Sequence, residues 1–140
     1  MSDKPINLDR LAAQHAQALI KSAKDDIETT VTKTLGVLQE DGVYACFLYL
    51  LAKEKENGKA TVAEMLNLLD GLKFGWGKPA SNKPEDILSH ITEKVTVHLE
   101  RLLLAKETLE QMLIYARYGA KARKDAEPEK GQSDSQENQS

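Results

Sequence analysis

Histidines are the first residues of this chain to weigh for chemistry, because imidazole binds metals and moves protons near neutral pH. His90 and His98 are eight residues apart. That spacing places them roughly 80° apart around a helix, and no His-Glu-x-x-His zinc motif joins them. His98 and Glu100 match half of a zinc-deaminase motif, but the Pro-Cys-x-x-Cys half does not follow. His15 lies on the expected apolar face of a helix, which favours a hydrogen-bonded histidine at the core edge over a ligand.

A glycine–lysine pair and the single cysteine are the other candidates for chemistry. Gly77-Lys78 is similar to the end of a phosphate-binding P-loop, but that motif needs a glycine where Leu72 stands and Ser or Thr where Pro79 stands. Cys46 lies inside an apolar run, so we expect a buried, inert thiol rather than a nucleophile. We therefore predict that the protein is not an enzyme and uses no metal and no cofactor.

Basic side chains on two predicted helices are the candidate binding residues. On the last helix, Arg117, Lys121 and Lys124 are spaced i, i+4 and i+7, so they form one ridge, with Arg123 beside it. This ridge suits contact with phosphates, and it suits equally a solvated helix end whose cations offset the macrodipole. The residues that we predict to contact nucleic acid are Arg10, Lys21, Lys24, Arg117, Lys121, Arg123 and Lys124.

Trp76 stands between two glycines in a segment, residues 71–82, that is too rich in glycine and proline for regular structure. An indole in such a loop either packs against the folded domain or is offered to a partner. Both readings fit the sequence, and we predict Trp76 as a partner-interface residue.

Hydrophobic periodicity predicts that helices position all of these residues. The predicted helices span about residues 8–24, 27–40, 43–56, 61–72 and 84–124, the last either continuous or bent near 96–99. Asn7 or Asp9 can cap the first helix, and Pro84 suits the first turn of the fifth. No strand pattern competes, so the predicted fold class is all-α, a compact bundle of five to six helices.

Local signals set the expected boundaries of the central helices. Gly42 tolerates left-handed geometry and is predicted to end the second helix. Asn57-Gly58 is predicted to end the third helix, and Thr61 with Glu64 forms a capping box predicted to start the fourth. Because the helix at 43–56 is apolar nearly all round, we expect it at the centre of the bundle.

The acidic end of the chain dominates its net charge. The protein has 140 residues and a formal net charge of −3, and residues 125–140 hold five acidic side chains against one lysine. Residues 1–124 are thus close to neutral, so nucleic-acid contact must come from local patches. We predict a helical bundle domain over residues 1–124 and a disordered acidic tail over 125–140. No signal peptide or membrane-spanning run is recognisable, so we expect a cytoplasmic protein that contacts no membrane.

Three segments, in this order and spacing, carry a family resemblance. They are LDRLAAQHA at 8–16, LGVLQEDG followed by VYACFLYLLAK at 35–53, and LAKETL at 104–109 with YARYGAKA at 115–122. Over about residues 8–123, the chain resembles the small helical subunit of type III-B CRISPR effector complexes, the Cmr-type small subunit.

The resemblance implies a function in assembly and binding. It implies a compact bundle of five or six helices without catalytic residues, whose copies stack along a ribonucleoprotein beside the duplex of guide RNA and target RNA. The partners would be other subunits of the complex, further copies of this chain and the RNA backbone, and target cleavage would belong to another subunit. The alternative is a helical adaptor that self-associates through an apolar stripe and binds no nucleic acid. Salt distinguishes the two, because phosphate binding weakens steeply as salt rises and apolar association does not.

Overall fold

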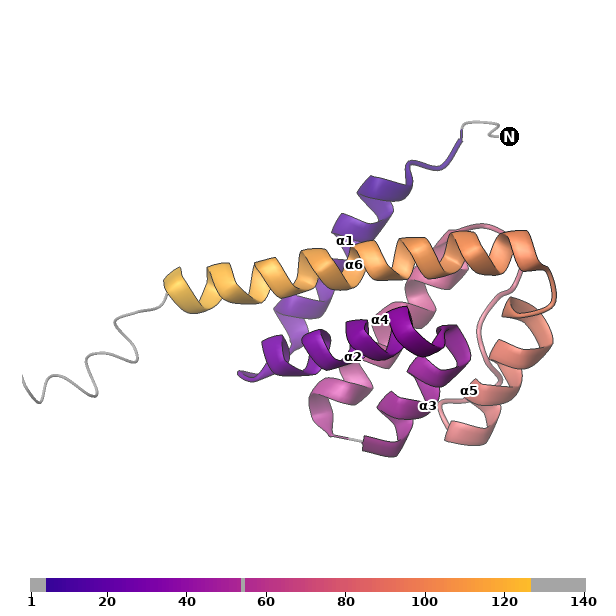
Figure 1. The fold of residues 1–140 in the computed structure, drawn as a ribbon, viewed down its shortest axis with the longest axis horizontal. Coiled ribbons are helices and arrows are strands. Elements are labelled where there is room, and N and C mark those ends of the chain that lie inside the picture. The colour runs from indigo at the N-terminus through magenta and orange to yellow at the C-terminus, as the bar shows by residue number, and fades with distance from the viewer. Residues whose placement is uncertain (1–4, 54, 127–140) are drawn as a thin grey trace, which may run out of the picture.

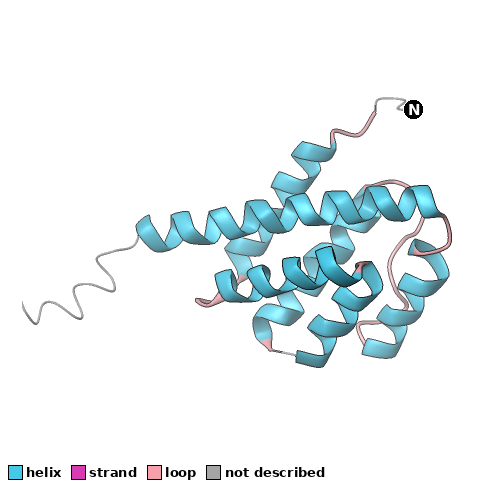
Figure 2. Cartoon of the chain, viewed as in Figure 1, coloured by secondary structure: helices cyan, strands magenta, loops and turns pink. Residues whose placement is uncertain are grey.

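The computed structural model describes residues 5–53 and 55–126, and this part of the chain is all-α, as predicted (Figures 1 and 2). Its elements are the α-helices α1 (Leu8–Ser22), α2 (Ile27–Asp41), α3 (Val43–Lys53), α4 (Glu56–Gly71), α5 (Pro84–His90) and α6 (Leu99–Ala126), and the π-helix η1 (Ile91–Val95). The predicted acidic tail lies outside the described residues, apart from 125 and 126, which continue α6.

The longest helix, α6, organises the bundle. Figure 1 shows α6 running along the length of the bundle, with α1 crossing it and α2 packed against it. Apolar residues along one face of this helix form a stripe that is buried, including Ala105, Leu109, Met112, Leu113 and Ala120. Since burial of a large apolar side chain stabilises a fold by about 1.5–3 kcal/mol, this stripe holds α6 against the two N-terminal helices.

Three predicted boundary signals are present in the structure. The Asn7 side chain accepts a hydrogen bond from the Arg10 amide at 3.0 Å, so Asn7 rather than Asp9 caps α1. Gly42 ends α2 with a φ of 98°, and its amide donates to the Leu38 carbonyl at 3.0 Å. Pro84 occupies the first turn of α5.

The predicted boundary between the third and fourth helices is wrong. Asn57-Gly58 does not end α3 but lies in the first turn of α4, and Thr61 lies inside that helix. The Thr61 hydroxyl donates to the Asn57 carbonyl at 2.7 Å instead of capping a helix start. Glu64 does not complete a capping box either, because its carboxylate pairs with His15 of α1.

The apolar helix α3 does not lie at the centre of the bundle, so that expectation from the sequence is wrong. Phe47 and Leu50 are fully buried, but Tyr44 is 38 % exposed and Leu48 is 46 % exposed. The helix therefore covers one side of the core and leaves part of its apolar surface to solvent.

The bend expected near 96–99 is a break between two helices. η1 ends at Val95 and α6 begins at Leu99. At this point the Thr96 amide donates to the Ile91 carbonyl at 3.0 Å, the five-residue spacing of a π-turn. The chain reverses here, and this reversal lets α6 run back across α2 and α1 (Figure 1).

Candidate nucleic-acid interface

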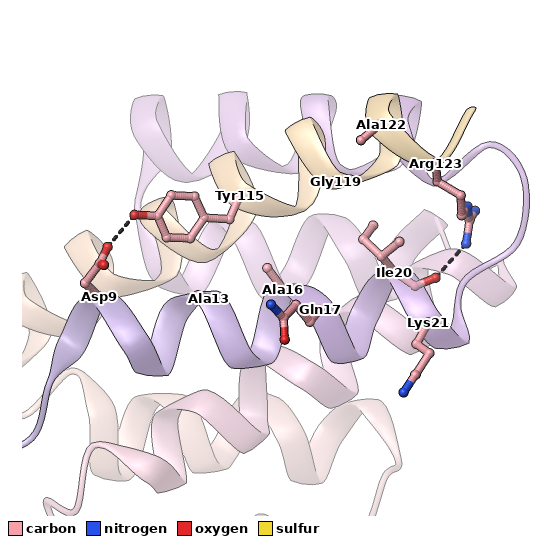
Figure 3. Close-up of a pocket in the computed structure, with 10 residues that line it drawn as sticks. All are labelled: Asp9, Ala13, Ala16, Gln17, Ile20, Lys21, Tyr115, Gly119, Ala122 and Arg123. Atoms are coloured by element: carbon pink, nitrogen blue, oxygen red, sulfur yellow. Dashed lines mark hydrogen bonds between the residues drawn. The ribbon is translucent and has the colours of Figure 1, made fainter. Parts of the chain in front are cut away.

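The C-terminal ends of α1 and α6 meet, and they bring most of the predicted basic residues together. Figure 3 shows Lys21 of α1 and Arg123 of α6 at the same end of the contact between these helices. The Arg123 guanidinium also reaches the carbonyl of Lys24. Five of the predicted residues lie near these two helix ends and are called the basic cluster below: Lys21, Lys24, Lys121, Arg123 and Lys124.

Arg123 ties the two helices together. Its guanidinium donates to the Ile20 carbonyl at 2.6 Å (Figure 3) and to the Lys24 carbonyl at 3.4 Å. The last four carbonyls of a helix lack partners within that helix, and α1 ends at Ser22, so Arg123 supplies donors at this end. Part of the guanidinium is therefore committed to the fold, which leaves less of it for a phosphate.

Three lysines of the basic cluster pair with carboxylates of the same chain. Lys121 and Lys124 both approach Glu28 of α2, at 3.2 Å and 3.9 Å. Lys24 lies 3.5 Å from Glu56 of α4. The three lysine side chains are 58–72 % exposed, whereas Glu28 is 27 % exposed, so solvent and a phosphate can reach the lysine side of each pair.

Lys21 is the cation of the cluster least engaged by the fold. It is exposed and forms no salt bridge with a described residue. Asp25 and Asp26, also exposed, follow α1 directly. The cluster is thus a mixed surface with a small excess of positive charge rather than a uniformly basic one.

Arg10 is the predicted contact that lies away from the basic cluster, whereas Arg117 borders the cluster on α6. Arg10 is exposed at the start of α1, and the helical rise of about 1.5 Å per residue places it roughly 16 Å from Lys21 along the helix. Arg117 lies on α6 one helical turn before Lys121, with its guanidinium 5.8 Å from the Tyr118 ring. Of the seven predicted contacts, six therefore lie along or just after the C-terminal parts of α1 and α6, and Arg10 lies apart at the start of α1.

A groove with a volume of about 980 Å³ lies between α1 and α6, beside the basic cluster (Figure 3). Small residues form much of its lining: Ala13, Ala16, Gly119 and Ala122. The helices are close here, since a Cβ atom on Gly119 would lie 3.4 Å from Ile20 Cγ1. Our sequence reasoning missed this groove, although small residues spaced i, i+3 on both helices are a usable signal for it.

Tyr115 and Asp9 lie at the other end of this groove (Figure 3). The Tyr115 hydroxyl donates a hydrogen bond to the Asp9 carboxylate. That hydrogen bond raises the pKa of Tyr115, because an ionised phenolate would lose the donor and face a carboxylate. The pair links the first turn of α1 to the middle of α6.

Trp76 is packed against the bundle rather than offered to a partner. Its side chain is 7 % exposed, and its ring meets the Phe74 ring edge-on with centroids 5.0 Å apart. The Arg101 guanidinium of α6 lies 5.0 Å from the Phe74 ring. The structure therefore corrects our choice between the two readings, since little of the indole is left for an interface.

The groups weighed for chemistry are spread through the fold. His15 Nδ1 lies 2.8 Å from a Glu64 carboxylate oxygen, which makes it a hydrogen-bonded histidine at the core edge, as expected. Burial raises the pKa of the Cys46 thiol to about 12, as expected for an inert buried cysteine. His90 is buried, whereas His98 is exposed in the break before α6.

Within residues 5–53 and 55–126, no group of three or more His, Cys, Asp or Glu side chains is placed to hold a metal ion. None of the described helices has the length and apolar character to span a membrane. No protein-family model, no curated protein and no solved structure matches the chain.

Proposed function

We propose that this chain is a non-catalytic small subunit of a type III-B CRISPR ribonucleoprotein, which stacks along the complex and contacts the backbone of the guide–target duplex. The observation that carries the proposal is that the C-terminal end of α6, with Lys121, Arg123 and Lys124, lies against the C-terminal end of α1, which carries Lys21 and is followed by Lys24. The helical fold and the resemblance of residues 8–123 support the same assignment.

The basic cluster suits backbone contact rather than base reading. Lysine ammonium groups neutralise phosphates without regard to sequence. Lys121 and Lys124 are 58 % and 72 % exposed in their pairs with Glu28, so phosphates can compete with the carboxylate for these two ammonium groups. In this proposal the chain orders RNA for another subunit, which carries out cleavage.

The test is a complex that lacks its own small subunit and is supplemented with this chain. The variant Lys21→Gln, Lys121→Gln, Lys124→Gln should assemble but bind target RNA more weakly at low salt. Loss of three phosphate contacts should lower the log–log salt slope by about two to three. The matched control is Lys83→Gln, Lys94→Gln, Lys106→Gln, which changes net charge equally and should leave the slope unchanged.

Two outcomes count against the proposal. Wild-type affinity and slope in the cluster variant would remove Lys21, Lys121 and Lys124 from the RNA surface, leaving Arg10, Lys24, Arg117 and Arg123 as the remaining predicted contacts. Failure of the unmodified chain to enter the complex would contradict the assignment itself.

A self-associating helical adaptor that binds no nucleic acid is the second candidate function. The apolar stripe of α6 is buried within the chain, so a second copy would have to contact other apolar residues. Such residues lie just before and within the start of α6, where Val97, Leu99 and Leu103 are 59 %, 67 % and 53 % exposed. Sedimentation velocity distinguishes this candidate: it predicts a dimer that Leu99→Lys with Leu103→Lys dissociates, and no RNA binding in either form.

A further inference from the structure

A second basic surface lies away from the basic cluster, where α2, α3 and α4 meet. A pocket with a volume of about 320 Å³ is formed there by the start of α2, the end of α3 and the first turn of α4. Three lysines line it: Lys33 within α2, Lys53 at the end of α3 and Lys55 directly before α4. The hydroxyl-bearing residues Thr29 and Thr30 of α2 add polar groups.

The charge of this pocket is less balanced by the fold than that of the basic cluster. All three lysines are exposed, and none forms a salt bridge with a described residue. Of the described lining residues, Asp26 is the one that is acidic, and its carboxylate already accepts a hydrogen bond from the Asn57 amide at 2.8 Å. These described residues therefore carry an excess of positive charge, three lysines against one aspartate, that suits an anion.

An aromatic ring stands beside these cations. Tyr49 lines the pocket, and the Lys53 ammonium lies 5.7 Å from the centre of its ring. Tyr49 and Lys33 also line a neighbouring hollow of about 440 Å³, so the space around the ring extends beyond the pocket. Gly58 adds no side chain to the lining, and a Cβ there would lie 3.4 Å from the Leu50 carbonyl.

We propose that this pocket binds a nucleoside monophosphate unit, with its phosphate among Lys33, Lys53 and Lys55 and its base stacked on Tyr49. An aromatic platform beside cations is the combination by which proteins hold single nucleotides of a strand. The volume lies at the lower end of the range for small-molecule pockets, about 300–1,000 Å³. The unit is either a free nucleotide or an unpaired residue of an RNA. The inference uses no residue of the basic cluster and does not depend on membership of a ribonucleoprotein.

Calorimetry on the full chain tests the shared chemistry with three probes. Adenosine 5′-monophosphate should bind, whereas adenosine and inorganic phosphate should each bind at least about tenfold more weakly, because each offers only one of the two contacts. Amide resonances of Thr29, Thr30 and Gly58 should shift on addition of the nucleotide. Inorganic phosphate binding as tightly as the nucleotide, or no binding of the nucleotide at millimolar concentration, would overturn the proposal.

Variants assign the binding to this pocket. Tyr49→Leu should weaken nucleotide binding by about tenfold or more. Tyr49→Phe, which keeps the ring, should bind the nucleotide as tightly as the wild type. The triple variant Lys33→Gln, Lys53→Gln, Lys55→Gln should bind adenosine 5′-monophosphate no more tightly than adenosine. The control variant Lys83→Gln, Lys94→Gln, Lys106→Gln should keep the wild-type difference in affinity between the two. Unchanged affinity in both pocket variants, with native circular dichroism, places the nucleotide elsewhere and overturns the assignment.

Hexa-adenylate RNA separates the two sources of the nucleotide. Tighter binding of the hexamer than of the mononucleotide, sensitive to Tyr49→Leu, assigns the pocket to single-stranded RNA. Equal or weaker binding assigns it to a free nucleotide. Either result can occur with or without incorporation into a CRISPR complex, so failure here and failure of the proposed function are separate findings.

Discussion

His90 ends α5 with 8 % of its surface exposed, and its Nε2 atom has no hydrogen-bond partner among the described residues. Burial, and then the nearby Lys94 ammonium, lower the pKa of His90 below its ordinary value of 6.5. The histidine is therefore neutral in the folded chain near pH 7, whereas the same residue in the unfolded chain takes up a proton more readily.

This difference predicts a pH dependence of stability. Since the unfolded state binds the proton first, the free energy of unfolding should be fully retained above about pH 6.5 and should fall as the pH drops through the lower folded-state pKa. Urea unfolding at about pH 7.5 and about pH 5.5 measures the loss. His90→Phe should flatten this dependence, and an equally steep loss in that variant would assign it to other groups.

Arg123 gives a second prediction at the scale of one residue. Arg123→Met keeps the apolar stem but removes the hydrogen bonds to the Ile20 and Lys24 carbonyls, so the free energy of unfolding should fall by about 1–2 kcal/mol. Arg10→Met, at an exposed site, is the control and should change stability by less than about 0.5 kcal/mol. Equal effects of the two substitutions would show that Arg123 does not hold α1 to α6.

At the scale of the helices, the sequence predicts what depends on near neighbours. The cap of α1 was predicted as Asn7 or Asp9 and is Asn7, and the end of α2 at Gly42 was predicted correctly, because each depends on residues within about two turns. Asn57-Gly58 was misread as a helix end because its partners are distant in sequence. The Asn57 side chain accepts from the Lys24 amide at 2.7 Å and donates to Asp26, and no local pattern reveals these contacts.

The start of α4 is therefore held by tertiary hydrogen bonds, and this is testable. Asn57→Ala removes the acceptor of the Lys24 amide and the donor to Asp26 in a buried setting, so the free energy of unfolding should fall by about 2–3 kcal/mol. Chemical denaturation measures the change, with Asn82→Ala in the exposed loop as the control. A cost near zero would mean that solvent replaces these hydrogen bonds and that α4 starts at Glu56 for other reasons.

At the scale of the whole molecule, the sequence predicted which residues belong to the candidate surface but not how the helices that carry them lie relative to one another. Periodicity placed Lys21, Lys24, Lys121 and Lys124 on solvent-exposed faces, and all four are exposed. It did not predict that α1 and α6 end side by side, nor that Glu28 lies between the two lysines of α6. The α2–α3–α4 pocket was missed for the same reason, because its three lysines belong to three regions of the chain.

The central claim is that this chain works as part of a guide-RNA complex, and its isolation from its own cells tests that most directly. The affinity-tagged chain would be recovered at near-physiological salt and its bound RNA and proteins identified. The proposal predicts a guide RNA together with larger subunits, both released as salt is raised, because phosphate contacts weaken with salt. Recovery of the chain alone, or only with further copies of itself, would contradict the proposal and favour the self-associating adaptor.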